Sequence, residues 1–360
     1  MNILQLIHLK EINRFLALSN ILLVPIKGIS KILGIHPYLI GLIAIASTLS
    51  SWQKIKVSHL VIFGLYITLI TFCSTSLQLK TFISYCILPG YIFYSSTNKF
   101  NEMSKIEIYG ITLILLTLLT SLTLNLFGFE KILFETYDLL EKPGHLRAKL
   151  IVSLNPFHFF TNEVYSGIVI EMMCLPVFYL LTDKRKSNKR NLTYTGILTL
   201  LAIIAKSRTV LIGLAAVITH WFLKEKYQKT FYFLIFFPFM IYLLPPEYLS
   251  GRDLVFDLFI KNFHFLGNGA GSSTRDIEII TNGFSTVFDN IHLQFLYEFG
   301  VVPYILVIWK IISIKNEKDR FKVLIITNLI GALSFDLHFY PIWFYIGKVL
   351  QSSKEKLLDN

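Results

Sequence analysis

The arginines outside the basic clusters are the residues of this sequence with the most specific chemistry. Arg208 lies inside an apolar stretch, Arg275 follows a glycine-rich segment, and Arg147 stands beside "PGH". A guanidinium group is a planar fork of N–H donors that pairs with two phosphate oxygens at once, as an ammonium group does not. No Asp-x-Asp motif or histidine cluster with metal-ligand spacing accompanies these arginines. The chemistry of these arginines suits phosphate binding, and the alternative for each is contact with solvent or a lipid headgroup.

The glycine-rich segment "FLGNGAGSS" (265–273) supplies a second set of candidates. Its Gly267, Gly269 and Gly271 alternate with other residues. This spacing lets backbone amides turn toward an anion as a nest, and it fits an ordinary flexible turn equally well. No strand–turn–helix unit surrounds the glycines, so a dinucleotide-binding site is excluded.

The elements that position these residues follow from composition. The chain of 360 residues is 54% hydrophobic and 16% charged, with a mean hydropathy of +0.58. Soluble globular proteins are about 45–50% apolar and about 25% charged. Apolar runs of about 17–23 residues recur from end to end, which is typical of a polytopic helical membrane protein. We therefore predict one all-α integral membrane domain over 1–360, with about 11–12 transmembrane helices.

The net charge of +11 does not indicate nucleic-acid binding, because the basic residues form short clusters between apolar runs. Such clusters mark cytoplasmic loops. The richest is "DKRKSNKRN" (183–191), and 224–229 and 310–322 agree with it. Cys73, Cys86 and Cys174 suit buried apolar positions and suggest neither disulfides nor a zinc site. The predicted spans lie near 14–33, 35–51, 57–75, 80–96, 106–126, 163–181, 192–206, 208–223, 230–246, 290–309, 323–338 and 341–351.

This topology leaves two long loops on the outer side of the membrane, about 127–162 and 247–289. Loops of this length are usually functional or disordered, and their aromatic residues favour function. Within the second loop, 253–264 is amphipathic and predicts a helix at the membrane surface, in which Asp257 and Lys261 form an i,i+4 pair. Its predicted apolar stripe consists of Val255, Phe256, Phe259, Ile260 and Phe263.

A short helical hairpin is the predicted setting of Arg208. Helices over 192–206 and 209–223 would each reach about 22 Å, less than the hydrocarbon core of about 30 Å. Arg208 would then lie at the tip, inside the protein and facing a cavity open to the outside. The alternative is an arginine that snorkels to the interface or pairs with an acid such as Glu171. Glu171, Glu298 and Asp336 are candidates because they are acids within predicted spans.

Three stretches resemble the O-antigen polymerases and ligases. The stretch "AKSRTVLIG" (205–213) resembles their central Ser-Arg-small-apolar signature, and 265–273 resembles the Gly-x-Gly-x-Gly element that begins their large outer loop. The stretch "DNIHLQFLYEFG" (289–300) resembles the segment that re-enters the membrane after that loop. Their order and spacing match across 192–310, the motif-bearing core.

The resemblance implies a bacterial inner-membrane glycosyltransferase of the GT-C type that has no cofactor and faces the periplasm with its active site. Such enzymes take a glycan from undecaprenyl pyrophosphate, and an acceptor hydroxyl attacks the anomeric carbon with inversion. In polymerases the acceptor is another lipid-linked repeat unit, which yields O-antigen or capsular or exopolysaccharide, and in ligases it is lipid A-core. The implied partners are the lipid-linked donor and acceptor and membrane lipids, with a chain-length regulator left open.

Residue roles follow from the chemistry and the resemblance together. The candidates for binding pyrophosphate are Arg208, Arg275, Arg147, Gly267, Gly269 and Gly271. The supporting residues are Asn290, Ser207 and Glu171.

The acceptor hydroxyl needs a base, and Asp289 and His292 are the candidates. Ligases carry His immediately before the Asn, where this chain has Asp289, and this difference favours a polymerase over a ligase. The two residues are three apart and would share a face of a helix. The alternative for Asp289 is an N-cap on the helix that starts near Asn290.

A transporter is the rival of another class, such as a flippase for the same lipid-linked glycans. Flippases generally keep short loops, so the two long outer loops argue against it.

Overall fold

The computed structural model describes the chain in separate stretches. These are 105–126, 175, 177–181, 188–204, 208–222, 252–281, 288, 290–314, 317–324, 326–327 and 342–349, together with single positions 15, 43, 46, 61, 64, 65 and 68. All the secondary-structure elements in these stretches are helices, which confirms the all-α prediction for this part of the chain. Within the same stretches, no helix combines the length and the apolar character that crossing a lipid bilayer requires.

The chain divides into two compact units. The first comprises Met1–Ile40 and Glu102–Trp221, and the second comprises Gly41–Asn101 and Phe222–Asn360.

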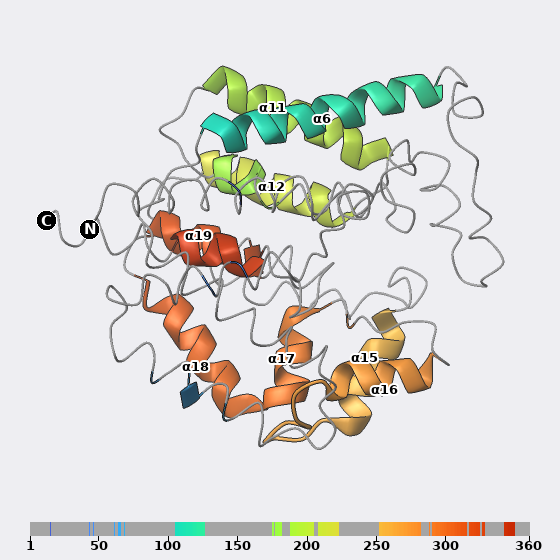
Figure 1. Cartoon of the computed structure of the whole chain (residues 1–360), viewed down its shortest axis with the longest axis vertical. Coiled ribbons are helices and arrows are strands. Elements are labelled where there is room, and N and C mark those ends of the chain that lie inside the picture. Colours follow the sequence, from blue (N-terminus) through green and yellow to red (C-terminus); the bar gives the residue numbers. More distant parts are fainter. Residues whose placement is uncertain are drawn as a thin grey trace, which may run out of the picture. The chain divides into compact units, whose positions relative to one another are not determined.

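The first unit contains α6 (Lys105–Leu126), α11 (Asn188–Ile204) and α12 (Arg208–Phe222). Helices α6 and α11 pack against each other (Figure 1), and the hydroxyls of Thr112 and Tyr194 hydrogen-bond across this contact at 2.6 Å. The described parts of the predicted 106–126, 192–206 and 208–223 are therefore confirmed as helices, while their crossing of a membrane stays a prediction. Residues 205–207, between α11 and α12, lie outside the described residues.

Threonine hydroxyls in these helices find acceptors on their own backbone. Thr112 donates to the carbonyl of Ile108 at 2.7 Å, and Thr195 donates to that of Asn191 at 2.8 Å. A hydroxyl that bonds the carbonyl four residues earlier needs no partner from solvent. These two threonine side chains are thus compatible with an apolar environment.

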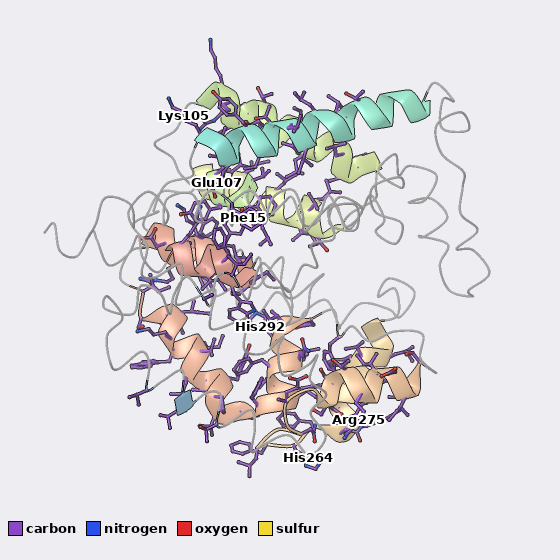
Figure 2. All side chains as sticks on the ribbon, in the orientation of Figure 1. Phe15, Lys105, Glu107, His264, Arg275 and His292 are labelled. Atoms are coloured by element: carbon purple, nitrogen blue, oxygen red, sulfur yellow. The ribbon has the colours of Figure 1, made fainter. Side chains whose placement is uncertain are left out.

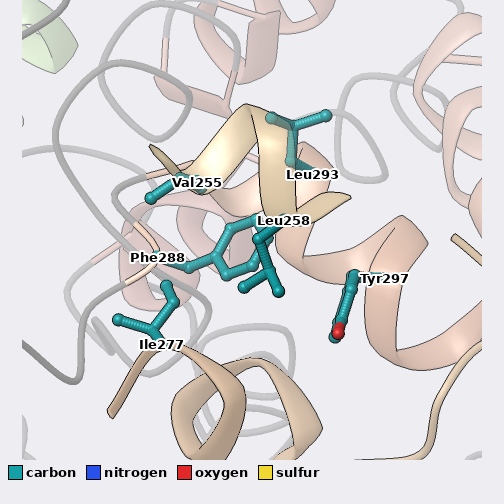
Figure 3. Packing of buried hydrophobic residues seen from close by; sticks show 6 residues of the cluster. All are labelled: Val255, Leu258, Ile277, Phe288, Leu293 and Tyr297. Atoms are coloured by element: carbon teal, nitrogen blue, oxygen red, sulfur yellow. The ribbon is translucent and has the colours of Figure 1, made fainter. Parts of the chain in front are cut away.

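The second unit contains α15 (Arg252–Asn262), α16 (Ser272–Ile280), α17 (Ile291–Phe299), α18 (Val301–Ile312) and α19 (Glu317–Leu324). Helices α15 and α16 both lie against α17 (Figure 1). The core between them is shown in Figure 3 and consists of Val255, Leu258, Ile277, Phe288, Leu293 and Tyr297. Burial of this apolar cluster holds the three helices together.

Helix α15 confirms the helix predicted over 253–264. Lys261 Nζ lies 4.0 Å from Asp257 Oδ2, which confirms the predicted i,i+4 pair, and the exposure of both side chains makes its contribution to stability small. The predicted apolar stripe is only partly right. Val255 enters the core and Phe256 and Phe259 pack against it, whereas Ile260 is 59% exposed.

Within the loop predicted over 247–289, residues 272–280 form helix α16. One prediction for 247–309 is wrong. The single span over 290–309 is two helices, because Gly300 has φ 81° and ψ −174° and so interrupts the helix between Phe299 and Val301. Pro303 in the first turn of α18 fits this break, since an amide there has no partner within the helix.

Candidate functional site

The glycine-rich segment joins α15 to α16 and docks on the end of α17. The amides of Asn268 and Gly269 donate to the carbonyls of Tyr297 and Glu298 at 2.8 and 2.9 Å. In return, the amide of Val301 donates to the carbonyl of Phe265 at 2.9 Å. Because the last carbonyls of a helix have no partner within it, this segment satisfies the end of α17.

Glycine is required at both sides of this contact. Gly267 and Gly300 have φ of 82° and 81°, in the left-handed region that side chains avoid. A Cβ at Gly267 would overlap the backbone of Glu298, and a Cβ at Gly300 would overlap the backbone of Phe265. Gly269 and Gly271 also have positive φ, at 92° and 82°. The two backbones therefore approach more closely than any other residue type allows.

The docking also bears on the predicted anion nest. The amides of Gly267, Asn268, Gly269 and Ser272 all donate to carbonyls of the chain. Docking on α17 accounts for the conformation of the segment. Pyrophosphate binding by these glycines stays a prediction, and it would have to use amides other than these four.

A buried polar cluster lies where α16 begins against α17. Ser273, Gln294 and Glu298 are each at most 1% exposed. The Ser273 hydroxyl donates to Glu298 Oε1, and Gln294 Nε2 donates to Ser273 Oγ at 3.1 Å and weakly to Glu298 Oε1 at 3.4 Å. Buried polar groups are costly unless they are hydrogen-bonded, so the three side chains specify one way of seating α16 on α17.

Arg275 lies two residues after Ser273 on α16, at the surface (Figure 2). Its Nε donates to Asp276 Oδ1 at 2.9 Å, and the Tyr297 hydroxyl donates to Asp276 Oδ2 at 2.7 Å. The hydrogen bond with Asp276 raises the pKa of Arg275, against the smaller opposing effect of its partial burial. Arg275 therefore stays a cation at all accessible pH values, and its side chain is 53% exposed.

Asn290 is the N-cap of α17. Its side-chain oxygen accepts from the amides of His292 and Leu293, each at 3.0 Å, and the residue is fully buried. The capping role considered for Asp289 is therefore filled by its neighbour. Asp289 itself lies outside the described residues, so its role as a base stays a prediction.

His292, the second candidate base, lies in the first turn of α17 (Figure 2). Its Nδ1 is 3.1 Å from the hydroxyl of Tyr304 on α18, and the two rings meet edge to face at 5.8 Å. His292 is 6% exposed. This contact bridges the break at Gly300 and orients the imidazole.

The second unit contains six of the predicted residues, in two groups. The glycine segment lies at the C-terminal end of α17, where Asp276 next to Arg275 contacts Tyr297, whereas Asn290 and His292 lie at the start of that helix. The six are Gly267, Gly269, Gly271, Arg275, Asn290 and His292. Arg208 begins α12 in the other unit, and only its backbone is described. Arg147, Glu171 and Ser207 lie outside the described residues. No three His, Cys, Asp or Glu side chains among the described residues are grouped to hold a metal ion.

Sequence reasoning missed Ser273, Asp276, Gln294 and Tyr297. Gln294 and Glu298 carried a signal, because two polar residues at i and i+4 in a largely apolar helix face the same neighbour. Ser273 and Asp276 carried none, since their partners are distant in sequence.

Comparison with known proteins found no matching family model, no matching curated protein and no matching solved structure.

Proposed function

We propose that this chain is an oligosaccharide repeat-unit polymerase of the O-antigen type, a multi-pass protein of the bacterial inner membrane. It joins undecaprenyl-pyrophosphate-linked repeat units at the periplasmic face. One observation carries the proposal: the two stretches 265–273 and 289–300, each similar to these enzymes, dock on each other through paired backbone hydrogen bonds. The docking places Arg275, an exposed cation, beside the helix that follows Asp289.

In the proposed reaction, the protein supplies a positive charge for the leaving pyrophosphate and a base for the acceptor hydroxyl. An acceptor hydroxyl forms the new bond to the anomeric carbon as the bond from that carbon to the pyrophosphate oxygen breaks, and the electron pair leaves with the lipid pyrophosphate. The Arg275 guanidinium neutralises the developing negative charge. Asp289 accepts the proton of the hydroxyl, with His292 as the alternative base. No metal ion is required in this scheme.

Composition supports the membrane setting of the proposal. The chain has 54% hydrophobic residues, and its basic residues cluster between apolar runs. Both features favour a multi-pass topology with the 247–289 segment in the periplasm. The partners are then the lipid-linked donor and acceptor and the surrounding lipids.

Reconstitution tests the proposal directly. The purified full chain in proteoliposomes, supplied with lipid-linked repeat units extracted from the producing cells, should yield a ladder of longer glycans and release undecaprenyl pyrophosphate. Transfer only to added lipid A-core would indicate a ligase, and translocation without chain growth would indicate a flippase. Either result would reject the polymerase.

Arg275→Ala is the informative variant in that assay. Loss of a charge-stabilising donor should lower the rate about a hundredfold. Lys261→Ala removes another exposed cation, from α15, and is the matched control that should retain the wild-type rate. Equal rates for Arg275→Ala and Lys261→Ala would remove Arg275 from the mechanism.

A further inference from the structure

Asp276 is bonded on both sides of its carboxylate. One oxygen accepts from Arg275 Nε at 2.9 Å and the other accepts from the Tyr297 hydroxyl at 2.7 Å. A carboxylate held by only one of these groups could swing about its own side-chain torsions. With both oxygens engaged, its position is set by the tyrosine.

The tyrosine is fixed in turn by the core of the unit. Tyr297 is 1% exposed, and its ring packs against that of Phe288 with centroids 5.6 Å apart. Its backbone carbonyl accepts from the amide of Asn268. The polar cluster of Ser273, Gln294 and Glu298 fixes the start of α16 on α17, the helix that carries Tyr297. Both ends of the link to Arg275 are therefore anchored.

The contact with Asp276 uses only one nitrogen of the guanidinium group, and the Arg275 side chain is 53% exposed. Asp276 takes Nε, and among the described residues no other hydrogen bond or ion pair is made by the guanidinium group, while the backbone amide of Arg275 donates to the carbonyl of Gly271. The two terminal nitrogens form the remaining edge, and their parallel N–H groups match two oxygens of one phosphate. An arginine held in advance loses less conformational entropy on binding than a freely rotating one.

We propose that Asp276 and Tyr297 are positioning residues, which hold Arg275 with its terminal nitrogens directed at a pyrophosphate group of the substrate. This inference rests on the proposed function for the identity of the substrate. Tyr297 touches no substrate and acts through Asp276. The alternative is that the three side chains form a stabilising contact of α16 and nothing more.

A double-mutant cycle separates these two roles, with inorganic pyrophosphate as the probe and the detergent-solubilised full chain as the protein. Tyr297→Phe keeps the ring in the core and removes the bond to Asp276. It should weaken pyrophosphate binding about tenfold in the wild-type background, because a hydrogen bond to a charged group is lost. In the Arg275→Ala background, the same change should have no further effect.

Asp276→Asn is the second variant, because it keeps the size of the side chain and removes its charge. It should weaken binding at least as much as Tyr297→Phe, again only when Arg275 is present. Thr281→Val is the control on the same helix, since it removes a hydroxyl bond to the carbonyl of Ile277. This control should leave pyrophosphate affinity unchanged. Binding should be measured at a temperature at which every variant is folded.

The outcomes are distinct. An equal loss of affinity from Tyr297→Phe with and without Arg275, or no loss in either background, would overturn the positioning role. Unchanged affinity in Arg275→Ala would overturn it as well, since Arg275 would then bind no phosphate. Arg275-dependent binding together with absent polymerisation would reject the polymerase proposal alone and leave the positioning role standing.

Discussion

Asn290 and Asp289 are adjacent residues with separable tasks. Asn290 is buried and accepts two amide hydrogen bonds at the start of α17, which are the contacts of an N-cap. A neutral amide is also too weak a base to take a proton from a sugar hydroxyl. The structure therefore assigns stability to Asn290 and leaves catalysis to its neighbour as a prediction.

Substitutions at these two positions should have opposite signatures. Asn290→Ala should lower the free energy of unfolding by about 1 kcal/mol, whereas Asn290→Asp should keep most of it because aspartate also caps helices. Asp289→Asn should leave thermal unfolding unchanged and lower polymer formation by orders of magnitude, since an amide cannot act as a base. Chains of normal length made at the normal rate by Asp289→Asn would exclude the base assignment.

The sequence alone indicated which residues could have a role here, but not which residues they contact. The need for an N-cap near 290 was visible, but two adjacent residues could both fill it, and only backbone geometry decides between them. Arg275 was found because a guanidinium after a glycine segment is chemically distinctive. Asp276 was not found, because its meaning comes from Tyr297, which lies on another helix.

At the scale of elements, the close approach at Gly300 is the feature that shapes the second unit. The end of α17 and the start of α18 meet there, and the carbonyl of Phe265 occupies the space where a side chain would begin. The same position has a positive φ of 81°. Two independent constraints thus require glycine.

Gly300→Ala should destabilise the unit by more than the conformational cost of about 1–2 kcal/mol, because the overlap with Phe265 adds to it. The measurement is the thermal unfolding midpoint of the solubilised chain. Gly196→Ala on α11 is the matched control, because nothing lies within 4 Å of a Cβ at that position. That control should be neutral or slightly stabilising, since alanine favours helix over glycine. Equal midpoints for both variants would contradict the close approach.

The elements predicted correctly share one property. Helices α6, α11, α12 and α15 come from apolar or amphipathic runs whose ends are marked by charged residues, so local patterning is sufficient. The helix break at Gly300 depends instead on a segment earlier in the chain that docks there. Helix α16 has only nine residues and gains its stability from buried side chains such as Ser273 and Ile277. Local periodicity carries no record of such contacts.

At the scale of the whole molecule, the proposed topology requires the loops 183–191 and 247–289 to lie on opposite sides of the membrane. Lys189 is exposed at the start of α11, and Glu278 is exposed on α16. Both lie in segments that sequence assigns to loops, 183–191 in the cytoplasm and 247–289 in the periplasm. Ser273 lies in the same loop as Glu278 but is fully buried, so a cysteine at that position would not react with a reagent in solution.

Single cysteines at these positions test the topology. In a background lacking the three native cysteines, an impermeant thiol reagent applied to intact spheroplasts should label Glu278→Cys and not Lys189→Cys. Permeabilised cells should show labelling of both, which controls for reactivity. Labelling of Lys189→Cys alone in intact spheroplasts would invert the topology and exclude a periplasmic site.

The docking of the glycine segment on α17 also has a consequence for how the second unit opens. The amide hydrogens of Asn268, Gly269 and Val301 can exchange with deuterium only when the segment and the helix end separate, because each is bonded across that contact. Their exchange should therefore be slow and closely matched, although they lie on different sides of α16 and α17 in the sequence. Such shared protection marks a single cooperative unit. The segment and the helix would thus gain or lose their order together.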